Sequence, residues 1–207
     1  MRLVTLVSLW YGLIPNTYAN TADIQAGERK SAICAGCHGS RGIAPSANFP
    51  HLAGQSTNYL IKQLQNYQQA NSGRQAPMMT SIAAQLSEQD IQQLAAYYAA
   101  QPPRHPVSAA ESGIGKRLYL GGDMARDIAA CSACHGVHGQ GLTAAGFPAL
   151  SGQHALYTEQ QLNKFKQGQR HNDPNNMMTD ISRKLNAEEI AALAAYIATL
   201  TPPKAAN

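Results

Sequence analysis

Charged residues are scarce in this chain. They make up 14% of its 207 residues, against about 25% in a typical soluble protein. The formal net charge is +4, and no lysine-rich patch stands out that would place a docking face or indicate a nucleic-acid partner. Because a chain with few carboxylates gains little charge on acidification, this composition suits an acidic compartment; compositional drift explains it at least equally well.

Long apolar runs are also lacking beyond the N-terminus. A membrane-spanning helix needs about 20 apolar residues, and the one apolar run, Leu3 to Ile14, is shorter. It follows Met1-Arg2 and is broken by Pro15. This pattern predicts a signal peptide over residues 1–19, with cleavage after Ala19 or as late as residue 22. We therefore expect export to a bacterial periplasm, a location that is compatible with peripheral attachment to the inner membrane.

The chain has only four cysteines, and all of them lie in two copies of one pentapeptide: Cys34-Ala35-Gly36-Cys37-His38 and Cys131-Ser132-Ala133-Cys134-His135. Cys-x-x-Cys-His is the attachment signature of haem c, in which both thiols bond to the haem and the histidine binds iron. The pattern predicts covalent attachment at Cys34, Cys37, Cys131 and Cys134, with His38 and His135 as iron ligands. A redox dithiol would need a βαβ context, and zinc would need four ligands from two distant motifs.

A long internal repeat surrounds these motifs. Phe49–Gln55 matches Phe147–Gln153, and apolar positions further along each half also correspond. A repeat of this length indicates duplication of a whole domain. We predict domains at 23–101 and 109–203, joined by a proline-rich, extended linker at 102–108.

Helical periodicity dominates both halves, and clear strand alternation is missing, so we predict an all-α fold. Capping residues place the helix starts. The expected helices begin at Asp23, Ser56, Ser87, Ser112, His154 and Asn186, and the third and last end before Pro102 and Pro202.

Methionine pairs occupy matching places in the two halves: Met78-Met79 and Met177-Met178. We expect each pair to lie on a polar loop and to supply a thioether as the second axial iron ligand, a pairing that raises the reduction potential. Packing on a haem face is the alternative. Met124 has no counterpart in the first half and is interpreted as a packing residue.

Together, the haem motifs, the Phe-Pro-x-Leu-x-Gly-Gln segments, the methionine pairs and the Ala-Ala-Tyr closing helices resemble the diheme cytochrome c4 family. The resemblance implies two tandem class I cytochrome c-like domains, each wrapped around one covalent haem c, packed face to face with the haem propionates near the interface. It selects Met79 and Met178 as iron ligands, with Met78 and Met177 as the alternative. The loop Arg170–Pro174 makes the second copy one residue longer.

The remaining histidines, the recurring tyrosines and two glycines have simpler interpretations. We expect the histidines outside the motifs to face solvent or to form hydrogen bonds, and a distal iron ligand in a bis-histidine site is the alternative for each of them: His51, His105, His138, His154 and His171. Tyr59 and Tyr157 are expected to pack in the core or at a haem edge. Gly54 and Gly152 are expected to allow close backbone approach or a positive φ.

The predicted function is one-electron transfer with no bound substrate. The expected route runs from a quinol-oxidising complex or periplasmic copper protein to a terminal cytochrome c oxidase. Two alternatives remain open: an electron-entry subunit of a dehydrogenase, and a diheme peroxidase-like enzyme, which would need one open iron site.

Overall fold

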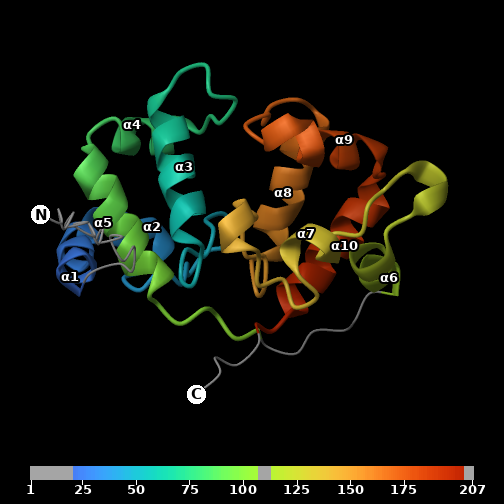
Figure 1. The fold of residues 1–207 in the computed structure, drawn as a ribbon, viewed down its shortest axis with the longest axis horizontal. Helices are drawn as coiled ribbons and strands as arrows, with labels where there is room; N and C mark the ends of the chain where they lie inside the picture. Colours follow the sequence, from blue (N-terminus) through green and yellow to red (C-terminus); the bar gives the residue numbers. More distant parts are fainter. Residues whose placement is uncertain (1–20, 107–112, 203–207) are drawn as a thin grey trace, which may run out of the picture.

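The chain forms two helical lobes that lie side by side and are joined by an extended segment at one end (Figure 1). This computed structural model describes residues 21–106 and 113–202. The predicted signal peptide, Ser112 and the last two residues of the predicted linker lie outside these ranges. Within them every element is a helix, accompanied only by isolated β-bridges, so the all-α prediction is confirmed. None of the helices in this part of the chain is long and apolar enough to cross a bilayer.

Two of the three helix starts predicted for the first lobe are found where side-chain chemistry places them. Ser56 Oγ accepts the Tyr59 N–H (3.4 Å) before the third helix, and Ser87 and Asp90 form a reciprocal capping box before the fifth. Asp23 instead lies within the first turn of the first helix, so the prediction that it caps this helix is wrong. The helices are α1 (Thr21–Lys30), α2 (Ala32–His38), α3 (Thr57–Gln68), α4 (Pro77–Ala83) and α5 (Glu88–Ala99).

The second lobe follows the same order with longer connections. His154 directly precedes its third α-helix, and Asn186 caps the last one in a second capping box, as predicted. The elements are α6 (Gly113–Gly121), η1 (Met124–Arg126), α7 (Ser132–His135), η2 (Thr143–Ala145), α8 (Ala155–Lys166), η3 (Pro174–Asn176), α9 (Met177–Lys184) and α10 (Ala187–Thr199).

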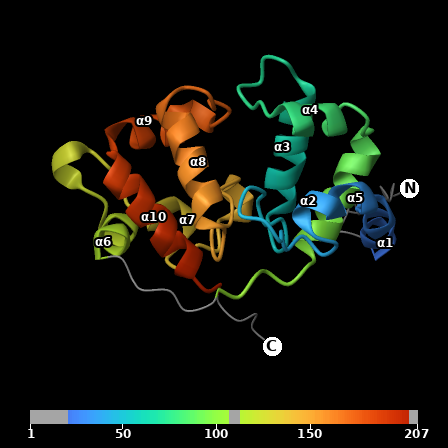
Figure 2. The ribbon, with the colours of Figure 1, turned by 180° about the vertical axis from the view of Figure 1, so that it is seen from behind.

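A glycine contact joins the first and last helices of each lobe. α1 packs across α5, and α6 packs across α10 (Figure 2). A Cβ at Gly27 would lie 2.0 Å from the Gln93 carbonyl oxygen, and one at Gly115 would lie 2.1 Å from that of Ala192. Only glycine allows the two backbones to come so close. The crossing ties the helix that precedes each Cys-x-x-Cys-His motif to the last helix of its lobe.

Two separate apolar cores support the motifs. Both include a tyrosine pair and both contact a motif cysteine, Cys34 in the first lobe and Cys131 in the second. The first core contains Leu60, Leu94, Ala95, Tyr97 and Tyr98. The second contains Leu118, Tyr119, Ile128, Leu162, Leu185, Ile190, Leu193, Tyr196, Ile197 and Leu200.

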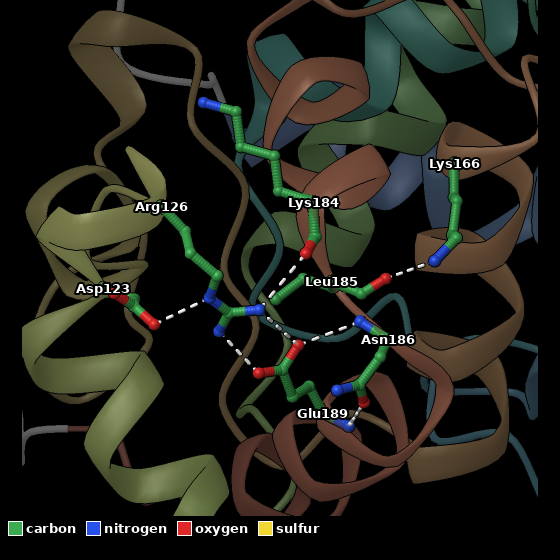
Figure 3. Close-up of polar contacts among 7 residues, drawn as sticks. All are labelled: Asp123, Arg126, Lys166, Lys184, Leu185, Asn186 and Glu189. Atoms are coloured by element: carbon green, nitrogen blue, oxygen red, sulfur yellow. Dashed lines mark hydrogen bonds and ion pairs between the residues drawn. The ribbon is translucent and has the colours of Figure 1, made fainter.

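A polar cluster anchors the loop before the second motif to α10 (Figure 3). Arg126 donates to Asp123 (2.7 Å) and to both carboxylate oxygens of Glu189 (3.2 and 2.5 Å). Glu189 also accepts the Asn186 N–H (2.9 Å) in the capping box. The same carboxylate therefore caps α10 and holds the loop that leads to α7.

Two expectations about methionines are wrong. The paired methionines lie at the starts of short helices, Met78 in α4 and Met177 in α9, rather than on loops. Met124 is 84% exposed, so it does not pack.

Candidate haem sites

A cavity of about 710 Å³ extends through both lobes and brings the predicted site residues together. Its walls are mainly apolar. Since protein interiors hold few voids larger than a water molecule, a cavity of this kind fits a large apolar group in each lobe. The lining includes Cys34, Cys37, His38, Met78 and Met79 from the first lobe, and Cys131, Cys134, His135, Met177 and Met178 from the second.

The two motif histidines have the same environment. His38 Nδ1 lies 2.9 Å from the Pro50 carbonyl oxygen, and His135 Nδ1 lies 2.9 Å from that of Pro148. Both rings are 6% exposed, and burial lowers the pKa of both. A neutral ring that donates through Nδ1 keeps Nε2 unprotonated, which is the form that binds a metal. The repeated Phe-Pro segment therefore supplies the carbonyl that orients each histidine.

The first cysteine of each motif has a raised thiol pKa. Burial raises the pKa of Cys34, and burial raises that of Cys131 to about 11. A reactive dithiol or a zinc site needs a thiolate with a lowered pKa. Among the residues that the structure describes, no group of three or more His, Cys, Asp or Glu side chains gathers to hold a metal ion. The geometry favours the haem interpretation over both alternatives.

The two methionines of the first pair differ in exposure, whereas those of the second pair do not. Met78 is 56% exposed, whereas Met79 is only half-buried. In α9 both methionines are half-buried, and Met178 packs against the second core. These positions favour Met79 and Met178 as the inward-directed members.

The repeated Phe-Pro-x-Leu-x-Gly-Gln segment also builds the contact between the lobes. The Gln55 amide donates to the Ala149 carbonyl (2.9 Å) and accepts its N–H (2.9 Å). The Gln153 amide donates to the His51 carbonyl (3.1 Å) and accepts the His51 N–H (2.9 Å). The segment was predicted from the sequence only as a mark of duplication. A glutamine that ends an identical motif in both copies is the signal that could have indicated a reciprocal interface.

His51 lies inside this interface, 7% exposed. Its Nδ1 accepts the Ala44 N–H (3.0 Å), and its ring stacks on His154 at 4.0 Å between centroids. His51 Nε2 is buried with no hydrogen-bond partner in the described structure. Burial, followed by the charges of His154 and Arg104, lowers the pKa of His51 to about 4.

Sequence reasoning missed two boundary arginines, Arg74 and Arg170. Each donates to a tyrosine of the opposite lobe, which gives Tyr157 and Tyr59 a bridging contact rather than simple packing. The predictions for Gly54 and Gly152 are confirmed, with φ of 69° and 66° and close contacts to residues 103–106.

Fold and site together define a two-domain c-type haem protein for electron transfer. The family model for cytochrome c matches residues 24–100 and 114–201. A cytochrome c4 from Azotobacter vinelandii is 42% identical over 206 residues, covering 94% of this chain and 96% of the relative. The chain belongs to the diheme cytochrome c4 family.

Two further relatives bear on the function. The crystal structure of reduced recombinant cytochrome c4 from Pseudomonas stutzeri superposes with a TM-score of 0.83 at 39% identity, covering 86% of this chain and 98% of that one. A thiosulfate dehydrogenase electron acceptor from Stutzerimonas stutzeri (strain A1501) is 41% identical over 182 residues, covering 85% of this chain and 83% of the relative. The protein is thus an electron-transfer protein with two covalent haem c groups, not an enzyme.

Proposed function

We propose that this protein carries electrons one at a time between redox proteins of the periplasm. Cys34 and Cys37 attach one haem c, and Cys131 and Cys134 attach the other. The axial iron ligands are His38 with Met79, and His135 with Met178. The observation that carries the proposal is the matched geometry of the two sites around one apolar cavity.

Residues of the chain orient the iron-binding histidines and exclude water at both sites, which suits electron transfer without a bound substrate. When bound, haem iron gains and loses a single electron. The carbonyls of Pro50 and Pro148 fix the tautomer and direction of the two histidines, and the apolar walls exclude water. His38 with Met79, and His135 with Met178, would hold the two irons and would leave neither iron a position for a substrate, and a thioether ligand would favour the reduced iron.

The absorbance spectrum of the reduced protein with and without carbon monoxide tests this closed coordination. We expect an unchanged low-spin c-type spectrum, since both irons are capped. A shift of about half of the haem signal would reveal one open iron and would overturn the proposal in favour of a peroxidase-like enzyme.

Methionine variants test the ligand assignment within each pair. Met79→Ala and Met178→Ala should each open one iron to carbon monoxide, while the neighbouring variants Met78→Ala and Met177→Ala serve as matched controls and should open neither. Carbon monoxide binding in the Met78 or Met177 variant instead would reverse the assignment in that lobe.

The proposed route runs from a quinol-oxidising complex or copper protein to a terminal cytochrome c oxidase. A relative named as a thiosulfate dehydrogenase electron acceptor supports the second candidate, electron uptake from a dehydrogenase. Stopped-flow reduction by a reduced quinol-oxidising complex, compared with thiosulfate plus thiosulfate dehydrogenase, separates the two routes. The faster donor at equal concentration identifies the physiological class of partner.

We further propose periplasmic location after cleavage at residue 19–22, and domain limits at 23–101 and 109–203 with a linker at 102–108. The signal pattern of the first 19 residues supports the location, and the extended course of residues 102–106 supports the linker. The mass of protein purified from a periplasmic fraction tests cleavage: a full-length mass would contradict it.

A further inference from the structure

Two arginines lie buried at the boundary between the lobes. Arg74 is 4% exposed and Arg170 is 6% exposed, and their backbones pair as an isolated antiparallel bridge. Each guanidinium lies over an aromatic ring of its own lobe, at 4.9 Å from the centre of Tyr67 and 4.4 Å from that of Phe165. The two lobes therefore place their arginines next to each other, in similar surroundings.

Every side-chain hydrogen bond of these arginines goes to a neutral group. Arg74 donates to Tyr157 (3.2 Å) and Gln63 (3.0 Å). Arg170 donates to Tyr59 (3.0 Å), Gln63 (3.2 Å) and two further amide oxygens. No ion pair joins either guanidinium to a carboxylate in residues 21–106 and 113–202. Both positive charges are thus buried without a counter-charge from the residues that the structure describes.

The surroundings carry an excess of positive charge. Burial and then the charge of the arginines lower the pKa of Lys62 and of Lys164. Burial alone would raise the pKa of the Tyr59 phenol, yet the arginine charges hold it below its usual value. The charge of Asp173 acts on Lys62 in the opposite direction, and the Asp173 carboxylate accepts the N–H and hydroxyl of Thr179 (2.9 and 3.0 Å).

A buried charge is strongly unfavourable unless a charge of opposite sign lies beside it. Arg74, Arg170, Lys62 and Lys164 all line the cavity that contains the two haem motifs, and haem brings carboxylate side chains. We propose that Arg74 and Arg170 form a single anion-binding seat for carboxylates of both haem groups, through which each arginine sets the reduction potential of both haems. This inference rests on the proposed haem sites.

The expected direction follows from charge. Reduction adds an electron to the iron, so a nearby cation favours the reduced form, and its removal lowers the potential. Because Arg74 contacts the first lobe through Gln63 and the second through Tyr157, its charge acts on both haems. An arginine that served only its own lobe would shift one potential.

The test is a redox titration of holoprotein in which NMR signals of the two ferric haems are followed separately. Arg74→Gln and Arg170→Gln should each lower both potentials. Arg29→Gln and Arg117→Gln remove the same charge from exposed positions, one in each lobe, and should leave both potentials unchanged.

A lysine variant separates charge from structure. Arg74→Lys keeps the positive charge and should keep both potentials close to those of the unaltered protein. The inference is overturned if Arg74→Gln shifts only the first-lobe haem, if it shifts neither, or if Arg74→Lys lowers both potentials equally. Carbon monoxide binding is measured on the same samples. If carbon monoxide leaves the spectrum unchanged and the potentials do not shift, the anion-binding seat is refuted and the proposed function stands.

Discussion

Acidification should weaken this protein through His51. In the folded state the neutral ring accepts the Ala44 N–H and lies against His154 and near Arg104. Protonation would remove the acceptor and place a positive charge on a buried ring near Arg104. Burial and these charges lower the pKa of His51 to about 4, whereas an unfolded histidine titrates near 6.5.

The sign and size follow from proton linkage. Between pH 6.5 and 4 the unfolded chain binds more protons at this position, so stability falls as the pH falls. The stability that the neutral His51 ring contributes is fully present above about pH 6.5 and is lost as the pH approaches 4. A shift of this size corresponds to about 3 kcal/mol at 1.36 kcal/mol per pKa unit.

The assay is urea unfolding of holoprotein from pH 7.5 to 4, comparing the unaltered chain with His51→Asn. The variant is less stable at pH 7.5, and its deficit should shrink by about 3 kcal/mol at pH 4 because it lacks the titrating ring. His105→Asn, an exposed histidine of the connecting segment, is the control and should show the full pH dependence. A His51→Asn deficit that stays constant across this range would refute the reasoning.

Two further variants test the interface. Gln153→Ala leaves the backbone N–H and carbonyl of His51 unpaired, so we expect a loss of about 2 kcal/mol; a loss below about 0.5 kcal/mol in urea unfolding would show that water replaces the amide. Gly54→Ala places a Cβ 2.8 Å from Pro103 Cβ at a φ of 69°, while Gly146→Ala meets no atom within 4 Å at a φ of 76°. Both substitutions cost about 1 kcal/mol because alanine disfavours a left-handed backbone. Calorimetry should show a greater loss of stability for Gly54→Ala, and equal losses would contradict the predicted clash.

Local chemistry explains why so much of the site was predictable. The Cys-x-x-Cys-His pentapeptides, the capping boxes at Ser87 and Asn186, and the apolar stripes act over a few residues, so their geometry depends little on the rest of the chain. Both methionine pairs line the cavity, but they were expected on loops and lie at the starts of helices. The short α4 contains a proline in its first turn and little periodic pattern, and so it resembles a loop in sequence.

The contacts between the lobes could not be predicted from these local sequence patterns. Arg74 lies seven residues after Tyr67, whereas Arg170 lies five residues after Phe165, so the repeat does not align the two arginines. They become neighbours because the loops of different length meet across the boundary. Likewise, His51 has only an alanine as its counterpart, and its burial depends on residues more than 100 positions away.

The sequence by itself determined the two haem motifs, the duplication, the helices and the family resemblance, since each of these is encoded in short spacings or capping chemistry. The tertiary structure alone decided which polar side chains share the boundary: two interface glutamines, the ring pair of His51 and His154, and two buried arginines that pair with no carboxylate in the described part of the chain. The physical reason is that burial and charge depend on what packs opposite, and a linear pattern does not specify the opposite surface.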